Sequence, residues 1–137
     1  MKVISIKEPF ATLIMNGDKI IETMSWKTNY RGELFIHASG KNLAKEYLNN
    51  PIVLQLIKDL EMNYGSIICK CELVDCIYMD EKFINEIKAN LKEYNCGLYE
   101  IGRYAWILDN IIPIQPIAIK GHLNIWNYDG DYKMMSK

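Results

Sequence analysis

The first third of the chain alternates between strand-like and helix-like spacing of its apolar residues. Residues 3–6 alternate apolar and polar side chains, which predicts a short strand. Residues 9–17 open on a proline, carry apolar residues at helical spacing and close on a glycine, which is the pattern of a short helix. Alternation returns over residues 20–25 and 33–38 and predicts two further strands.

The middle third combines short amphipathic stretches with the longest strand-like run of the chain. Residues 43–48 predict a short helix, and Pro51 opens a second one whose apolar stripe we expect to face the core. Residues 66–79 are rich in Ile, Val and Cys and predict a long strand. Asp80 is a suitable N-cap for a helix over about residues 81–93.

The last third has a β-type pattern interrupted by prolines. Pro113 and Pro116 lack the N–H that an inner strand needs, so they restrict this stretch to sheet edges or bends. One domain is expected over residues 1–130, followed by a polar, frayed tail over residues 131–137. The strands predicted here cover residues 104–108, 112–114, 117–119 and 123–126.

Short strands with helices inserted between them predict an α+β fold built on a small barrel-like sheet. The length of 137 residues suffices for one such domain, and 50% hydrophobic with 24% charged residues is usual for a soluble globular protein. No apolar run approaches the length of a bilayer span, and Glu8 and Pro9 interrupt the N-terminal apolar stretch too early for a signal peptide. We therefore expect a cytoplasmic protein with no membrane partner.

The four cysteines are expected to be free thiols, because the chain has no secretion signal. Cys69 and Cys71 fall on one face of the predicted long strand, where cysteine usually behaves as a small buried hydrophobe. The two histidines, His37 and His122, are not spaced like a metal-ligand pair. No metal or other cofactor is predicted, and His37, which lies in the apolar run LFIHAS, is interpreted as a core histidine.

The net charge of −1 argues against a protein that coats nucleic acid by electrostatics alone. The charge is nevertheless uneven along the chain. Residues 1–48 carry seven Lys or Arg against five Asp or Glu, whereas residues 49–100 carry five against nine. An anionic ligand should therefore be bound mainly by the N-terminal third, where Lys7 is one of the basic residues.

Three residues are candidates for proton-transfer chemistry. Lys19 stands where the first predicted helix gives way to a strand; an ammonium there can meet a phosphate or, when desolvated, act as a base or nucleophile. The alternative is a solvated loop lysine. Glu22 and Glu72 each lie in an apolar strand, so each either points to water or occupies a pocket with a raised pKa that suits a general acid or base. If Lys19 and Glu72 converge, they form a pair that can shuttle protons during hydrolysis.

Other residues are candidates for ligand binding. Trp26 and Tyr104 are flanked by polar or basic residues and can stack on unpaired bases, although aromatic side chains on strands usually pack in the core. Arg31 can clamp a phosphate or bind a neighbouring carboxylate. Ser39 and Lys41 offer a backbone N–H and a cation to an anion at a helix start.

Four stretches resemble the ASCH domain family, which shares its fold with the PUA superfamily. They are residues 5–39, GSIICKCELVDC (65–76), GRYAWIL (102–108) and KGHLNIW (120–126), and they occur in the family's order. The resemblance implies a PUA-like β-barrel decorated with helices. It also implies a cleft between the first helix and the barrel that suits RNA, a nucleotide or a nucleobase.

The resemblance extends to relatives that are amidohydrolases, which deacetylate N4-acetylcytidine with a lysine, a threonine and a glutamate. The lysine and the glutamate match Lys19 and Glu72, but Glu22 holds the position of the threonine, and Met24 stands where many relatives have an arginine. Three functions remain open. They are RNA or nucleotide binding, hydrolysis of a modified nucleobase or of single-stranded RNA, and a non-catalytic role as a protein–protein adaptor.

Overall fold

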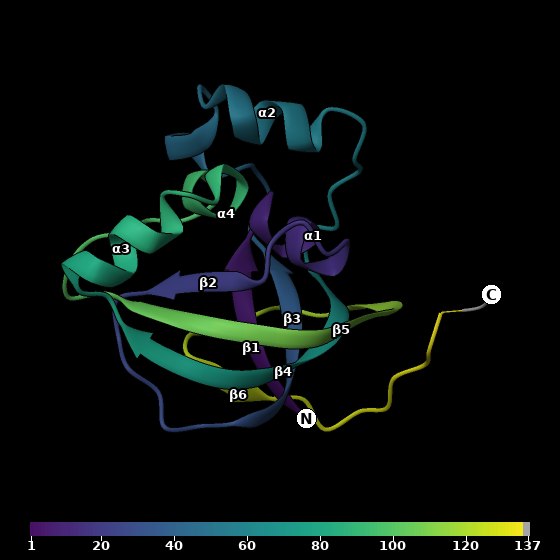
Figure 1. Ribbon diagram of the computed structural model, residues 1–137. Helices are drawn as coiled ribbons and strands as arrows, with labels where there is room; N and C mark the ends of the chain where they lie inside the picture. Colours follow the sequence, from purple (N-terminus) through teal and green to yellow (C-terminus); the bar gives the residue numbers. More distant parts are fainter. Residues whose placement is uncertain (136–137) are drawn as a thin grey trace.

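Six strands form one curved sheet in the computed structural model, which describes residues 1–135 (Figure 1). They are β1 (Lys2–Lys7), β2 (Ile21–Met24), β3 (Gly32–Ser39), β4 (Ser66–Tyr78), β5 (Tyr104–Ala118) and β6 (Ile125–Asn127). Their order across the sheet is β2-β5-β4-β3-β1-β6. β1 runs parallel to β3, and the other neighbouring strands are antiparallel.

The long β4–β5 pair gives the sheet its curvature. Its register shifts at three places, between residues 67 and 69, 70 and 72, and 73 and 75 of β4. Because such bulges bend a strand and increase its twist, the sheet curls into a half-barrel. The predicted α+β class and barrel-like sheet are thereby confirmed.

The helices are short, and side-chain caps set where several of them begin. They are α1 (Phe10–Met15), the 3-10 helix η1 (Lys45–Tyr47), α2 (Pro51–Ile57), α3 (Glu81–Ile87) and α4 (Leu91–Asn95). Asn50 caps α2 and Asp80 caps α3, each by accepting a backbone N–H. Asn90 caps a further helix, α4, so the single helix predicted over residues 81–93 is in fact two.

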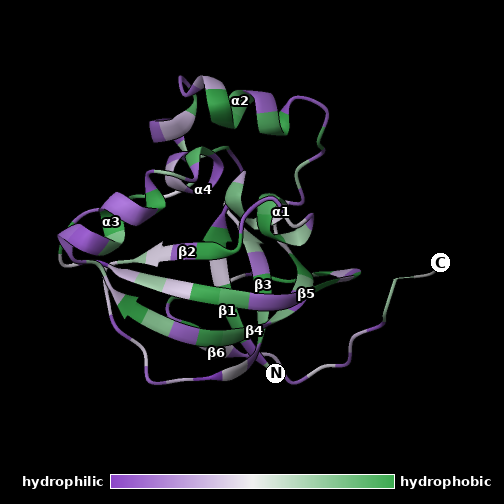
Figure 2. Ribbon diagram, viewed as in Figure 1, coloured by the Kyte–Doolittle hydropathy of each residue, from purple (hydrophilic) through white to green (hydrophobic). Residues whose placement is uncertain are grey.

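Helices α2, α3 and α4 gather at one end of the sheet, with α1 nearest to the strands (Figure 1). In Figure 2 the middle of the sheet is largely hydrophobic, whereas α3 is largely hydrophilic. No helix within residues 1–135 is both long enough and apolar enough to cross a lipid bilayer.

The main core lies between α1 and the sheet. Residues 10–14 of α1 are all buried, and the four apolar ones pack in one cluster with Trp106 of β5. Cys69 and Cys71 of β4 belong to the same cluster, so the face that the alternation predicted for them is confirmed. Glu72, the next residue along β4, is exposed on the opposite face.

Strand β5 joins three predicted short strands into one. Only residues 104–107 of β5 pair with β2, so the part that carries Pro113 and Pro116 has no strand of the sheet on that side within the described chain. The edge placement predicted for these prolines is confirmed. The predicted tail contacts β5 through an isolated bridge between Ile114 and Met134, and its residues 136–137 lie outside the described residues.

Candidate functional site

A cavity of about 380 Å³ opens where β1 and β2 lie beside the helical end of the sheet. Its walls come from β1, the start of α1, β2, the η1 turn and the segment between α4 and β5. The volume is within the range of small-ligand sites. We call it the Glu22 cavity. The lining residues that matter below are Lys7, Phe10, Glu22, Met24, Tyr47 and Arg103.

Glu22 carries an unsatisfied carboxylate oxygen on the wall of this cavity. Its Oε1 accepts a hydrogen bond from the N–H of Thr23 at 3.0 Å. Its Oε2 is buried and has no hydrogen-bond partner among residues 1–135. Burial raises the pKa of the Glu22 carboxyl, and the positive charge of Lys19 offsets part of this rise.

Lys19 is fully buried directly behind the Glu22 cavity. Gly17 ends α1 with a φ of 87°, and the turn that follows brings the Lys19 N–H to the carbonyl of Leu13 at 3.1 Å. The Nζ group donates to the carbonyl of Ile21 at 2.5 Å and to the carbonyl of Cys96. Lys19 is therefore a buried cation tied to backbone, and it does not line the cavity.

Glu93 on α4 is a second buried carboxylate in the same region. Its Oε1 accepts the N–H of Ile20 at 2.6 Å, and its Oε2 is buried without a partner in the described part of the chain. Burial raises the pKa of Glu93, and the hydrogen bond from Ile20 and the charge of Lys19 oppose that rise. The positive charge of Lys19 thus acts on both carboxylates, and Arg103 adds a second positive charge near Glu22.

Arg103 presents a guanidinium to the cavity just before β5 begins. Its Nε donates to the carbonyl of Leu98 at 3.1 Å, and its Nη2 donates to the carbonyl of Thr23 at 3.2 Å. These two bonds fix the side chain, and within residues 1–135 it makes no ion pair with a carboxylate. Its other N–H groups are free to bind an anion.

The rest of the cavity wall is largely apolar. Phe10 and Tyr47 meet edge to face, with ring centroids 4.7 Å apart. Met24 of β2 contributes a flexible apolar side chain where the resemblance expects an arginine. Arg103, just before β5, supplies a guanidinium to the same cavity.

A groove of about 570 Å³ adjoins the Glu22 cavity and shares Ser5, Lys7 and Met24 with it. We call it the Lys120 groove. It is also lined by Trp26 and Lys120, among other residues. The groove and the cavity are therefore neighbours, separated by these three side chains.

Hydrogen bonds fix one wall of the Lys120 groove. His37 is buried; its Nε2 lies 2.7 Å from the carbonyl of Ile119, and its Nδ1 lies 3.2 Å from Ser5 Oγ. Trp126 Nε1 donates to the same Ser5 Oγ at 3.1 Å. Burial lowers the pKa of His37, which favours the neutral imidazole. Because Nε2 must donate to the carbonyl, Nδ1 of the neutral ring accepts a hydrogen bond from the Ser5 hydroxyl. The interpretation of His37 as a core histidine is confirmed.

The structure brings some of the sequence-predicted site residues together. Glu22 and Lys7 line the Glu22 cavity, and Lys19 lies behind Glu22. Trp26 and Ser39 line the Lys120 groove together with Lys7. These residues come from β1, the turn before β2, β2 itself, the loop after it and β3, so the opening segment of the chain supplies most of the site.

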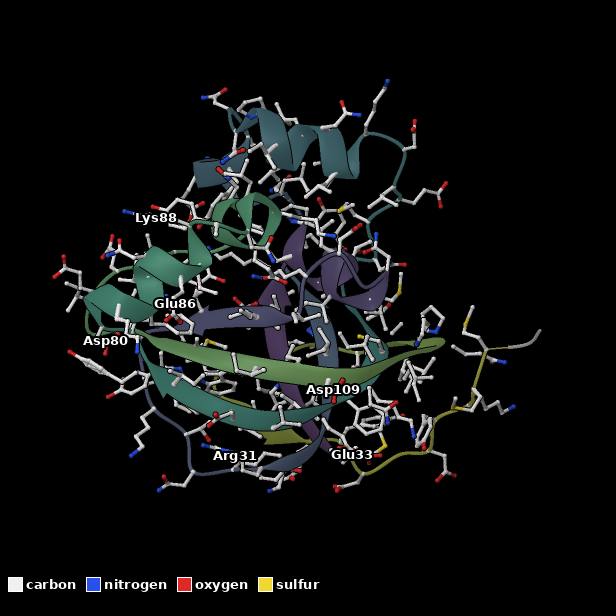
Figure 3. All side chains as sticks on the ribbon, in the orientation of Figure 1. Arg31, Glu33, Asp80, Glu86, Lys88 and Asp109 are labelled. Carbon is white, nitrogen blue, oxygen red and sulfur yellow. The ribbon has the colours of Figure 1, made fainter. Side chains whose placement is uncertain are left out.

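Other predicted residues lie elsewhere. Glu72 is exposed on β4, where it pairs with Glu33 of β3 and Asp109 of β5. Figure 3 labels these two neighbours, which lie at the side of the sheet away from the helices. Arg31 lies on that side too, where it donates to the carbonyl of Thr28 at 3.0 Å. Lys41 is exposed, and Tyr104 packs edge to face on Tyr78 with ring centroids 5.8 Å apart. Neither the cavity nor the groove is lined by any of these four predicted residues, Glu72, Arg31, Lys41 and Tyr104.

Sequence reasoning missed three residues of the site: Glu93, Arg103 and Tyr47. Arg103 belongs to the stretch GRYAWIL and stands just before β5. The sequence pattern does not indicate which way a side chain at such a position points. In the sequence, Glu93 has the pattern of a solvent-exposed glutamate on a helix. Its burial depends on the cap at Asn90, which starts a separate helix and turns Glu93 towards Lys19.

Comparison with known proteins gives a consistent result. A model of the ASCH domain matches residues 4–119. Activating signal cointegrator 1 of Mus musculus is 27% identical over 133 residues, which is 92% of this chain but only 22% of the length of that relative. The solved structure of an ASCH protein from Zymomonas mobilis has a TM-score of 0.53 at 20% identity, over 85% of this chain and 71% of that one. A variant of that bacterial protein gives a TM-score of 0.52 at 21% identity, over 86% of this chain and 73% of the other.

Proposed function

Because the chain belongs to the ASCH domain family, we propose that its Glu22 cavity binds one unpaired nucleotide of RNA. The observation that carries the proposal is the buried, unpartnered Oε2 of Glu22 in a cavity that also presents a fixed arginine. A buried acceptor without a donor is unfavourable in the free protein. A ligand that supplies the donor therefore gains affinity there.

The Glu22 carboxylate suits a base that carries an amino group. Carboxylate side chains accept hydrogen bonds from the exocyclic amine of cytosine, and such a contact discriminates between bases by about 1–3 kcal/mol. The apolar neighbours Phe10 and Met24 strengthen this preference, since neither can donate a hydrogen bond to Oε2 of Glu22 in place of the ligand. Uracil has a carbonyl in place of the amine and should leave Oε2 unsatisfied.

Arg103 and Lys7 suit the phosphate of the same nucleotide. The free N–H groups of Arg103 have the fork geometry that binds phosphate oxygens, and Lys7 is exposed at the wall shared with the groove. Glu22 and Glu46 also line the cavity, so its formal charge is balanced. This balance favours a singly phosphorylated nucleotide with an amino-bearing base over a polyphosphate.

The test compares cytidine and uridine monophosphates, which differ in the group that Glu22 would contact. Calorimetry with the wild-type protein should give roughly five- to one-hundred-fold tighter binding of the cytidine nucleotide. Glu22→Gln replaces the acceptor with a donor and should abolish or invert this preference. Glu72→Gln removes the same charge from an exposed strand position and is the matched control.

Two outcomes would count against nucleotide binding in the Glu22 cavity. One is the absence of binding for every nucleoside and nucleotide tested, which would favour the adaptor hypothesis. The other is binding that Glu22→Gln leaves unchanged in affinity and base preference, which would move the ligand to another surface.

Hydrolysis is a second candidate function, favoured by the raised pKa of Glu22 inside a cavity. A carboxyl whose pKa is raised in this way is better suited to general acid–base chemistry than an exposed glutamate. Lys19 and Glu72 do not line the cavity, so the enzyme hypothesis rests on Glu22. Chromatography of reactions with N4-acetylcytidine and with short single-stranded RNA tests it: Glu22→Gln should remove turnover, and intact substrate in every wild-type reaction would refute it.

A further inference from the structure

The Lys120 groove is a second recognition surface next to the cavity. The two depressions share Ser5, Lys7 and Met24, so a ligand longer than one nucleotide can contact both. Lys7 stands at this junction. A phosphodiester next to Lys7 would therefore link a nucleotide in the cavity to a nucleotide in the groove.

The charge of the groove suits a polyanion. Its lining includes the cations Lys7 and Lys120 and the side chain of His122, and no carboxylate lines it within residues 1–135. This contrasts with the Glu22 cavity, where two glutamates balance the cations, and with a whole chain whose net charge is −1. The local excess of positive charge favours the phosphates of a nucleic-acid strand.

The groove also offers a fixed aromatic surface. Trp26 is partly exposed in it, and its ring packs edge to face on the buried Trp106 with centroids 4.7 Å apart. This contact holds the indole in place and leaves part of it exposed, which favours stacking of an unpaired base. Leu123, which is 90% exposed, adds apolar surface to the same groove.

The floor of the groove is closely packed. Gly121 approaches the Ser5–His37 hydrogen bond so closely that a Cβ on it would lie 2.6 Å from Ser5 Oγ and 2.7 Å from His37 Cε1. The residues that follow Gly121 are thereby held next to β1 and β3, beside Lys120. Such packing restricts the floor before a ligand binds, which lowers the cost of ordering a bound strand.

From this geometry we infer that the physiological ligand is a single-stranded RNA segment, of which one nucleotide occupies the Glu22 cavity and the adjoining nucleotides occupy the Lys120 groove. This inference rests on the proposed function of the cavity and extends it. The junction phosphate binds Lys7, the next phosphate binds Lys120, and the neighbouring base stacks on Trp26. Free mononucleotides are accordingly incomplete ligands.

The experiment measures binding of cytidine mononucleotide, dinucleotide and tetranucleotide to the full chain. The tetranucleotide should bind at least about tenfold more tightly than the mononucleotide, because one stacked base contributes a factor of roughly five or more. Its affinity should also fall more steeply with salt, by about 0.7 in the logarithmic slope for each added phosphate contact. Quenching of tryptophan fluorescence should accompany the tetranucleotide.

Lys120→Gln tests the groove separately from the cavity. It should weaken tetranucleotide binding about two- to fivefold, lower its salt slope by about 0.7 and leave mononucleotide binding unchanged. Lys88→Gln is the matched control, because Lys88 is an exposed lysine on the helical side that lines neither the cavity nor the groove. It should affect neither ligand.

The outcomes separate the two proposals. If the mononucleotide binds in a Glu22-dependent manner and the tetranucleotide binds no more tightly, the groove proposal is overturned and the cavity proposal stands. Equal losses in Lys120→Gln and Lys88→Gln would also overturn the groove proposal, since the effect would then be one of net charge. If Glu22→Gln changes the binding of no ligand, the cavity proposal fails, and the extended site fails with it.

Discussion

Replacing Glu22 with glutamine should stabilise the protein at neutral pH. The substitution keeps the acceptor for the Thr23 N–H and removes a negative charge whose second oxygen is buried without a partner. Leaving such a buried acceptor unpaired costs about 1–3 kcal/mol. The substitution recovers only part of this, because the attraction of the carboxylate to Lys19 and Arg103 is lost. We expect a net gain of about 1 kcal/mol in the free energy of unfolding, or about 3–5 °C in Tm for a chain of this length.

The pH dependence follows from the raised pKa of Glu22. Well below the unperturbed Glu pKa of about 4.3, the carboxyl is protonated in both states and contributes nothing to the difference. As the pH rises, the unfolded chain ionises first and the native carboxyl keeps its proton longer, so the native state binds more protons. The free energy of unfolding of the wild type therefore falls through this window, with a slope of at most about 1.4 kcal/mol per pH unit from this group.

Urea denaturation followed by circular dichroism from acidic to neutral pH measures both effects. The curve for Glu22→Gln minus wild type should rise from near zero and level off above the native pKa of Glu22. Glu93 titrates in both proteins, so its contribution largely cancels. Glu72→Gln, on the exposed face of β4, should stay within about 0.5 kcal/mol of wild type. If Glu22→Gln is equally or less stable than wild type at neutral pH, the prediction is wrong, because the attraction of the carboxylate to Lys19 then outweighs the cost of its burial.

Three more predictions concern the surroundings of the site. Lys19→Met removes a buried donor to two carbonyls and should lower the free energy of unfolding by about 3 kcal/mol in urea titration, so loss of ligand binding in this variant needs a folding control. Only Cys76 should react quickly with a thiol reagent at about pH 8, because the other three thiols are buried and burial raises the pKa of Cys71 to about 12; fast reaction of more than one thiol would contradict this burial. Gly121→Ala should lower Tm, with a loss of about 1–3 kcal/mol, because its methyl group would collide with the Ser5–His37 pair, and an unchanged Tm would show that the floor of the groove can move.

The parts of the fold that local patterns determine were predictable from the sequence. Alternation placed Cys69 and Cys71 on the buried face of β4, and the same alternation accounts for the exposure of Glu72. It could not decide whether Glu22 faces water or a pocket, because that depends on what covers β2. The cover comes from the chain around residues 96–103, about eighty residues away, where Arg103 meets the carbonyl of Thr23. Contacts at such separation leave no trace in the spacing of a single sequence.

Hydrogen bonds beside the Glu22 cavity join two segments that are distant in the sequence, residues 19–23 and residues 96–103. Lys19 reaches the carbonyl of Cys96, Thr23 Oγ1 accepts the N–H of Leu98 at 3.0 Å, and Arg103 returns to the carbonyl of Thr23. Strand β2 is short, with four residues, and lies at the edge of the sheet. It should therefore open together with the α4–β5 connection, and their backbone amides should exchange with deuterium at a common rate. A ligand that bridges the cavity would close this opening, so slowed exchange in both segments would report its occupancy.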